Sequence, residues 1–472
     1  MKKYSLARGL KEKHIRLITL GGIIGSCYFL GSGYLIQETG PGAILSYLLG
    51  GLIVVSVMYC LGELTVAHKD NSFIGYKAKY ISPTWATGVG WSYWLTWVTY
   101  VPSEMIAAGI IMNTFFPQIS SVIWAIFFGA LITCINLLHV SSFGELEYWL
   151  AYIKITAIVG FTILAIAIFL GLMGSHHHFV GTSVLKDNGG FFPKGVLSIF
   201  LTMVVVLVNF QGSEIIGITA AESKDPEKSI PAAIKAVTVR IVLLYIVPIL
   251  MLVVIFPWNK AGLSQTVFAD ALQHYGLKTV AGCFAFVILT AAISTSNSGL
   301  YSCVRALYTM GMGRMAPSYF MKLNDNKVPK RATIFSILIC WVFVIIYTFD
   351  RSEFMYKYLL ALSGFSGSIA WISICWTQYR FRKKMIMENK LETLKFKTPW
   401  FPYLTLASIW VQISCLVVMV FTPALRASLY VGIPALILPM IIYKAKGVFK
   451  SKKEHRYKVY RPSISPLTPT SV

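Results

Sequence analysis

The sequence predicts an all-α polytopic membrane protein. Only 13% of its 472 residues are charged and 56% are hydrophobic, whereas soluble domains are about 25% charged. Apolar runs of about 18 residues or more, long enough to cross a bilayer as helices, recur along the whole chain. Lys and Arg lie mostly in alternate loops and in the two tails. These observations exclude a soluble enzyme, a soluble DNA-binding protein and a disordered chain.

A hydropathy window of about 19 residues, interrupted at clusters of charge or proline, predicts twelve transmembrane helices. Residues 1–14 and 445–472 are then tails, and because twelve is even, both tails lie on one side of the membrane. The predicted helices cover residues 15–36, 42–67, 88–115, 121–139, 148–172, 196–221, 236–257, 277–306, 332–349, 354–377, 403–421 and 428–444.

The distribution of positive charge assigns that side. A net charge of +23 would indicate a nucleic-acid partner in a soluble protein. Here Lys and Arg gather in residues 1–16 and 380–397, after residue 443, and in the other loops on the same side. This bias is the positive-inside pattern. It predicts cytoplasmic termini, contact with the anionic lipids of the cytoplasmic membrane, and no nucleic-acid partner.

Two predicted spans contain small and polar residues that are unusual in a lipid-facing helix. The first contains "GGIIGSCYFLGSG" and the sixth contains "NFQGSEIIG". Their Gly-Ser pairs, Gly25-Ser26 and Gly212-Ser213, are five spans apart, which indicates a five-plus-five inverted repeat with helices 1 and 6 broken. Alternatively, these small residues form helix-packing faces. The predicted parts are a core of residues 15–377, made of repeats 15–172 and 196–377, and two additional helices in 403–444.

Three charged residues lie at predicted membrane depth: Glu104, Lys154 and Glu214. A carboxylate at the centre of a span costs about 2.5–3.5 kcal/mol on insertion scales, so it is expected to face a cavity or a partner. Glu214 either caps backbone N–H groups at the break in its helix, contacts a cationic group or carries a proton. Glu104 has either a site role or a packing role. Lys154, near the start of its span, either extends its ammonium group to the interface or is buried.

Several stretches resemble one family over nearly the whole chain and in the expected order. They include the first-span glycine motif, "LGELTVAHKDNSFIGYKAKYISPTWATGVGWSYWLTW" (61–97), "FQGSEIIGITAAESKDPEKSIPAAI" (210–234) and "SNSGLYSCVRALYTMGMGRMAPSYFMKLNDNKVPKRA" (296–332). These stretches resemble the amino acid–polyamine–organocation transporters, and within them the permeases for lysine, proline, aromatic amino acids and GABA. The resemblance implies an inverted-repeat fold with spans 1 and 6 broken at the substrate site.

The resemblance also implies the residues of that site. Backbone N–H groups at the start of a half-helix suit the substrate's carboxylate, and unwound carbonyl groups suit its ammonium. Cys27 departs from the family, which usually has glycine there. In some proton-coupled members of the family, a lysine on span 5 takes the place of a sodium ion and bridges spans 1 and 8. Hydroxyl groups on span 8 would then contact this lysine; alternatively, they bond the backbone of their own helix, as such groups often do. The expected carboxylate contacts are Gly25, Ser26 and Cys27; the ammonium contacts are Ile23, Ile24 and Phe210; further substrate contacts are Glu104, Gly212, Ser213, Glu214, Ile216 and Thr219; the coupling residues are Lys154, Ser294, Thr295 and Asn297.

We therefore expect a secondary transporter that imports a free amino acid with a proton, with some preference for cationic amino acids. An obligate amino acid exchanger and an amino acid sensor of the same fold are the alternatives. No spaced group of catalytic or metal-binding residues appears at membrane depth, so we expect no enzyme activity, cofactor or metal. The eight cysteines lie in apolar segments and the loop at 116–120 contains none, so no disulfide-linked partner subunit is expected.

Overall fold

The structure, a computed structural model, describes residues 24–68, 73–138, 143–174, 179–214, 226–263, 266–324, 328–349 and 353–451. Within these ranges the chain is helical and contains no strand, as predicted. The helices are η2 Cys27–Gly31, α2 Ser32–Thr39, η3 Gly40–Gly42, α3 Ala43–Ala67, α4 Phe73–Tyr80, α5 Pro83–Phe115, α6 Ser121–Leu138, α7 Phe143–Phe169, α8 Ser183–Asp187, α9 Ser198–Leu201, α10 Met203–Phe210, α12 Pro226–Arg240, η4 Ile241–Ile246, α13 Val247–Ile255, η5 Trp258–Lys260, α14 Val267–His274, α15 Lys278–Met312, η6 Ser318–Met321, α16 Lys330–Phe349, α17 Glu353–Met387, η7 Leu391–Thr393, α18 Tyr403–Phe421, α19 Pro423–Arg426 and α20 Leu429–Ser451.

Nine helical stretches among the described residues are long and apolar enough to cross a membrane, and Ser121–Leu137 forms a shorter apolar helix. The predicted first and second spans lie together in one of the nine, Cys27–Ala67, where Gly40 with a φ of 72° forms the turn. The predicted sixth span is missing from the nine because it is divided into α9, α10 and non-helical residues after Phe210. A helical membrane protein is thus confirmed, while the count of twelve and the inverted repeat remain predictions.

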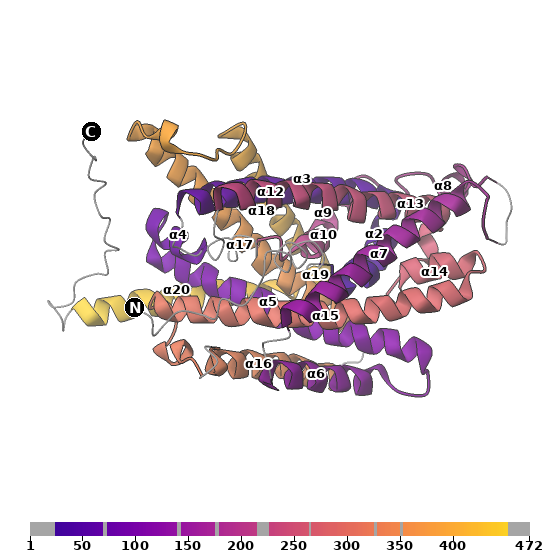
Figure 1. Cartoon of the computed structure of the whole chain (residues 1–472), viewed down its shortest axis with the longest axis horizontal. Coiled ribbons are helices and arrows are strands. Elements are labelled where there is room, and N and C mark those ends of the chain that lie inside the picture. Colours follow the sequence, from indigo (N-terminus) through magenta and orange to yellow (C-terminus); the bar gives the residue numbers. More distant parts are fainter. Residues whose placement is uncertain are drawn as a thin grey trace.

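Helices α5 and α15 lie in the middle of the bundle (Figure 1), and α5 also packs against α6, α16, α17 and α20. In the most apolar 18 residues of each helix, 89% are buried in α5, whereas only 11% are buried in α20. Small residues allow the close packing of α5, because Gly88 faces Met440 of α20 and Gly90 faces Met310 of α15. The central position of α5 lets its polar side chains reach the interior.

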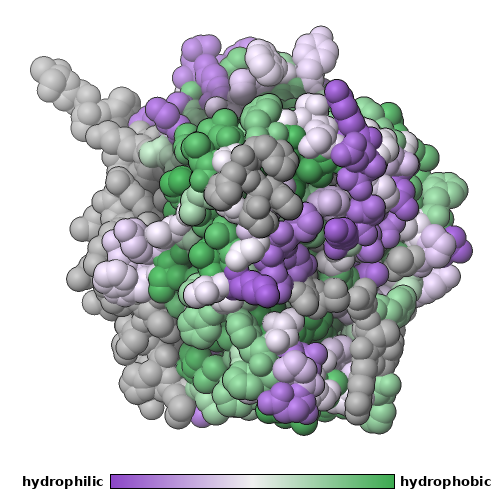
Figure 2. Space-filling view, turned by 90° about the vertical axis from the view of Figure 1, so that its right-hand side faces the viewer, coloured by the Kyte–Doolittle hydropathy of each residue, from purple (hydrophilic) through white to green (hydrophobic). Residues whose placement is uncertain are grey.

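The two ends of the bundle carry different short helices. Helices α8 and α14 lie at one end and α4 at the other (Figure 1). The ring centroid of Phe268 of α14 lies 5.3 Å from that of Tyr28 and 5.4 Å from that of Phe29. Helix α14 therefore covers η2 from this end of the bundle. Figure 2 shows this end, where hydrophilic residues gather among hydrophobic ones. Along the bundle, large apolar side chains such as Leu52 and Ile163 are exposed, as expected for a surface in contact with lipid.

Candidate functional site

The predicted first break corresponds to residues 24–25, the first described residues of the chain, which are non-helical, lead into the helix that contains η2 and lie against α5 and α15. A Cβ atom on Gly25 would lie 2.9 Å from Thr295 Oγ1 and closer still to the hydroxyl of Tyr100 and the carboxylate of Glu104. A side chain at this position would force the ends of these three side chains to shift, so glycine allows the close approach. The glycine-rich first span therefore brings bare backbone directly against polar groups of two other helices.

Glu104 binds the backbone N–H that follows the first break. Ser26 N donates a hydrogen bond to Glu104 Oε2 at 3.0 Å, and both residues are fully buried. Tyr356 of α17 lies close to them. Ser26 Oγ lies beside Glu104 and the Tyr356 hydroxyl, and the Tyr100 hydroxyl lies beside Glu104. Within the described part of the chain, Glu104 Oε1, Ser26 Oγ and the Tyr356 hydroxyl make no hydrogen bond of ordinary geometry. Because buried polar atoms are nearly always paired, this cluster has the unsatisfied groups that a polar ligand would need.

Aromatic side chains connect this region with the predicted second break, which corresponds to the non-helical residues 211–214 after the end of α10. The buried thiol of Cys27 lies near Tyr47 and Tyr245. The ring centroid of Tyr245 is 4.6 Å from that of Tyr28 and 4.8 Å from that of Phe210, the last residue of α10. The structure therefore brings together Cys27 and Phe210, two of the residues predicted from the sequence, where η2, η4 and α10 meet.

Glu214 holds the second break in place. Gln211 is extended and Gly212 has a φ of 95°, a left-handed conformation that favours glycine. Glu214 Oε2 accepts hydrogen bonds from Gly212 N and Trp371 Nε1, each at 3.0 Å, and Oε1 accepts one from the Tyr93 hydroxyl at 3.2 Å. Of the roles considered for this carboxylate, the acceptance of a hydrogen bond from a free backbone N–H, that of Gly212, is present in the structure. The same contacts join the break to α5 and α17.

Further polar residues surround the second break. Ser213 Oγ donates to the Phe210 carbonyl at 2.9 Å and accepts from Arg240 Nη2 at 2.9 Å, so the carbonyl expected to face a substrate ammonium already has a donor. Gln211 and Ser363 of α17 exchange two hydrogen bonds, at 3.0 and 3.1 Å. The sequence analysis missed both Arg240 and Gln211. Each is a strongly polar side chain inside a predicted apolar span, and that signal would have identified them.

The predicted coupling residues have three different environments. Lys154 is fully buried and its Nζ donates to Ser294 Oγ at 2.9 Å, so α7 is joined to α15. Thr295 Oγ1 donates to a carbonyl of its own helix at 2.7 Å, the alternative expected for such hydroxyl groups. Asn297 Oδ1 accepts a hydrogen bond from Asn136 of α6 at 2.9 Å. Lys154 and Ser294 thus form a pair, while Asn297 contacts a different helix.

Some predicted site residues fall outside the described residues, namely Ile23, Ile216 and Thr219. Ile24 is buried at the first break. In the ranges that the structure covers, no three His, Cys, Asp or Glu side chains are grouped as they would be around a metal ion.

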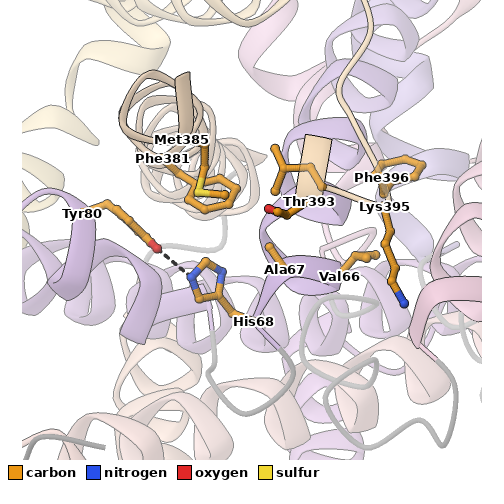
Figure 3. Close-up of a pocket in the computed structure, with 10 residues that line it drawn as sticks. Val66, Ala67, His68, Tyr80, Phe381, Met385, Thr393, Lys395 and Phe396 are labelled. Atoms are coloured by element: carbon orange, nitrogen blue, oxygen red, sulfur yellow. Dashed lines mark hydrogen bonds between the residues drawn. The ribbon is translucent and has the colours of Figure 1, made fainter. Parts of the chain in front are cut away.

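A separate cavity of about 260 Å³ lies at the α4 end of the bundle, between the ends of α3 and α17 and residues 393–396 (Figure 3). His68 Nε2 lies 2.6 Å from the Tyr80 hydroxyl, and Nδ1 lies 3.0 Å from the Leu64 carbonyl. Because a carbonyl only accepts, Nδ1 carries the hydrogen and Tyr80 donates to Nε2. Burial lowers the pKa of His68 and so favours this neutral form. None of these residues was predicted as part of a site.

Comparison with known sequences gives matches along almost the entire chain. The family model "Amino acid permease" matches residues 14–456. Amino-acid permease RocE of Bacillus subtilis is 39% identical, covering 93% of this chain and 94% of its own. The gamma-aminobutyric acid permease of the same organism is 33% identical, covering 98% of both chains. The lysine-specific permease LysP of Escherichia coli is 33% identical, covering 93% of both chains.

Among solved structures, a mutant manganese transporter of Eremococcus coleocola superposes with a TM-score of 0.55, covering 93% of this chain and 94% of its own. The two sequences are 14% identical. This likeness concerns the fold of the helical bundle alone.

Proposed function

The chain belongs to the amino acid permease family, and from that premise we propose that it imports a free amino acid across the cytoplasmic membrane together with a proton. It is an integral membrane transporter and not an enzyme. The end of the bundle with α4 faces the cytoplasm in this proposal. The basic stretch 380–397 comprises the last residues of α17 and the segment after it, at this end of the bundle. In membrane proteins, loops rich in Lys and Arg lie on the cytoplasmic side.

The main support for a substrate site is the set of unpaired polar atoms at the first break. Ser26 Oγ, Glu104 Oε1 and the Tyr356 hydroxyl are buried together, and among the described residues none of them makes a hydrogen bond of ordinary geometry. An amino acid at neutral pH carries a carboxylate and an ammonium group, and it supplies both acceptors and donors to such a cluster. A helix that begins at this point also favours an anionic group near its first N–H groups. Amino acid binding at the first break satisfies these atoms.

Proton coupling is supported by the burial of Lys154. A lysine that extends its ammonium to the interface would expose it, whereas Lys154 is fully buried and donates to Ser294. Burial disfavours the charged form of an amine, so such a group can release and regain a proton when its surroundings change. Because this hydrogen bond joins α7 to α15, gain or loss of the proton on Lys154 would change the contact between the two helices.

Cationic amino acids are the first substrates in this proposal. The similarity to a lysine-specific permease supports a cationic substrate. The chain is equally similar to a gamma-aminobutyric acid permease, so uptake of cationic amino acids should be compared with uptake of neutral zwitterions. Glu214 adds no support for a cationic substrate because three donors already bind its carboxylate.

The test is uptake of radiolabelled amino acids by proteoliposomes that contain the purified chain, with an inward proton gradient and no sodium. We expect one class of amino acid to accumulate, and a protonophore to abolish the accumulation. Uptake that requires an internal amino acid and does not depend on the proton gradient would contradict this proposal and identify the protein as an obligate exchanger. Binding in a thermal-shift assay without any flux would replace it with a sensor.

A further inference from the structure

The N–H group at the first break is occupied by an anion that belongs to the protein itself. The site proposed above uses the first N–H groups of η2 to hold the substrate's carboxylate. In the structure, Ser26 N donates at 3.0 Å to Glu104 Oε2. A carboxylate side chain has the same charge and the same acceptor geometry as the carboxylate of an amino acid. Glu104 therefore has the position and the chemistry of the group that the site is expected to bind.

We propose that Glu104 is an internal competitor of the substrate, and that it leaves Ser26 N and takes up a proton when the carboxylate of the amino acid binds there. The inference rests on the proposed function and assigns a role to one residue within it. In the empty transporter the side chain of Glu104 accepts the hydrogen bond from Ser26 N. In the loaded transporter the substrate does so, and the protonated side chain remains beside it.

Electrostatics makes the proton necessary. Two carboxylates at one buried N–H group repel each other, and one of them has to be neutralised. The groups around Glu104 do not neutralise it, since they are Tyr100 on its own helix, Cys27 on η2, Tyr356 on α17 and Thr295 on α15. Among the described side chains of α7, Lys154 is the charged one, and it contacts Ser294, the residue before Thr295.

The surroundings also provide for the protonated form. A protonated carboxyl group becomes a hydrogen-bond donor and needs an acceptor. Ser26 Oγ is buried without a partner among the described residues, and the substrate's own carboxylate would lie at the same place. Glu104 Oε1 makes no hydrogen bond of ordinary geometry there and lies beside the Tyr100 hydroxyl, so this oxygen can carry the proton and donate it to a neighbouring oxygen.

Linkage gives the measurable consequence. If substrate binding requires one proton on Glu104, the affinity for the amino acid falls about tenfold for each pH unit above the range in which Glu104 is protonated in the empty protein. Binding also takes up about one proton per amino acid from the buffer. Glu104→Gln has no charge and nearly the same shape, so its affinity should be independent of pH over that range and higher than that of the wild type at the alkaline end.

The experiment uses the full-length purified chain in detergent. A thermal-shift screen of the twenty L-amino acids and GABA at pH 5.5 identifies a ligand, and titration calorimetry from pH 5.5 to 8.5, in two buffers with different ionisation enthalpies, gives affinity and proton uptake. Glu38→Gln is the matched control, because it makes the same chemical change at an exposed position of α2 and should keep both the pH slope and the proton uptake.

Each outcome decides the matter. Proton uptake near one in the wild type and near zero in Glu104→Gln supports the inference. Binding without proton uptake in the wild type overturns it and leaves amino acid transport standing, and this measurement needs no variant that has to fold. An unchanged pH slope in a folded Glu104→Gln assigns the proton to another group and also overturns the inference. If no amino acid binds at any pH, the proposed function fails as well.

Discussion

Arg382 of α17 and Glu63 of α3 form an ion pair inside the protein, although 319 residues separate them in the sequence. Arg382 Nε donates to Glu63 Oε1 at 2.6 Å, and Nη2 contacts Oε2, so the pairing is bidentate. The same carboxylate accepts hydrogen bonds from Gln378 Nε2 at 2.9 Å and from the backbone N–H of Thr398 at 2.8 Å. The second predicted span is thus fixed to α17 and to the segment that follows it.

Removal of one partner from this pair should destabilise the protein strongly. Arg382→Met leaves the Glu63 carboxylate buried without its counter-charge, which typically costs about 3–5 kcal/mol in the free energy of unfolding. Chemical denaturation in detergent micelles measures this change. Lys384→Met is the control, because its pair with Glu388 is exposed and should contribute less than about 1 kcal/mol. The double variant Glu63→Leu/Arg382→Met should recover much of the loss, and equal losses in the control and in Arg382→Met would contradict the prediction.

Gly25→Ala should abolish amino acid uptake. The added methyl group would overlap Tyr100 and Glu104, so the first break would move away from α5. Gly160→Ala on α7 is the matched control, because its added Cβ meets nothing within 4 Å and the variant should transport like the wild type. Initial rates in proteoliposomes, at equal amounts of reconstituted protein, compare the two variants. Normal uptake by Gly25→Ala would show that the close packing seen here is not needed for transport.

Lys154→Met should separate transport from its driving force. The substitution keeps the length of the side chain but removes the titratable group between α7 and α15. We expect accumulation against a concentration gradient to fall at least tenfold, while exchange of external for internal amino acid continues because the first break is unchanged. Lys278→Met, at an exposed position of α15, should leave both activities as they are. Undiminished proton-driven accumulation in Lys154→Met would remove this residue from the coupling mechanism.

Stability should depend on pH through Asp270 of α14. Burial raises the pKa of Asp270 to about 6 from an ordinary value of 3.8, so the folded chain holds this proton more tightly than the unfolded chain. The contribution of Asp270 to stability is therefore complete below about pH 3.8 and is lost as the pH rises through about 6. Asp270→Asn should raise the melting temperature at pH 7.5 and leave it unchanged near pH 4.

The exposed Asp187 of α8 provides the control for this measurement, since Asp187→Asn should not change the melting temperature at either pH. A stabilisation by Asp270→Asn that is equal at pH 4 and pH 7.5 would mean that the amide acts through packing and not through the loss of charge.

Composition and local pattern were sufficient to predict the helical class. Residues 24–25 and 211–214 are non-helical where the breaks were expected, while residues 1–23 and 215–225 lie outside the described part of the chain, so the breaks themselves remain predictions. Gly212 stands where the backbone has a positive φ, and Gly25 stands where an added side chain would displace Tyr100 and Glu104. The sequence left the position of Lys154 open between the interface and the interior, and the structure has both Glu104 and Lys154 fully buried. A charge at membrane depth needs a polar environment, and this is why both residues drew attention.

The partners of these groups could not be predicted from a single sequence. Glu214 finds its donors 121 and 157 residues away, on Tyr93 and Trp371, and such pairs depend on how the helices pack. Hydropathy also ended the tenth span at residue 377, whereas α17 continues to Met387. A helix keeps its own hydrogen bonds outside an apolar layer, so charge at Arg382 ends the hydropathy signal but not the helix.

Cys27 gives the protein a natural reporter of access to its interior. Its thiol is buried beside Glu104, whereas Cys134 and Cys283 are exposed on the outside of the bundle. Once those two are replaced by serine, a charged maleimide added to one face of a membrane can reach Cys27 only while a path from that face is open. The rate of labelling then measures how often each face opens, and an amino acid that slows the labelling reveals its own residence in the site.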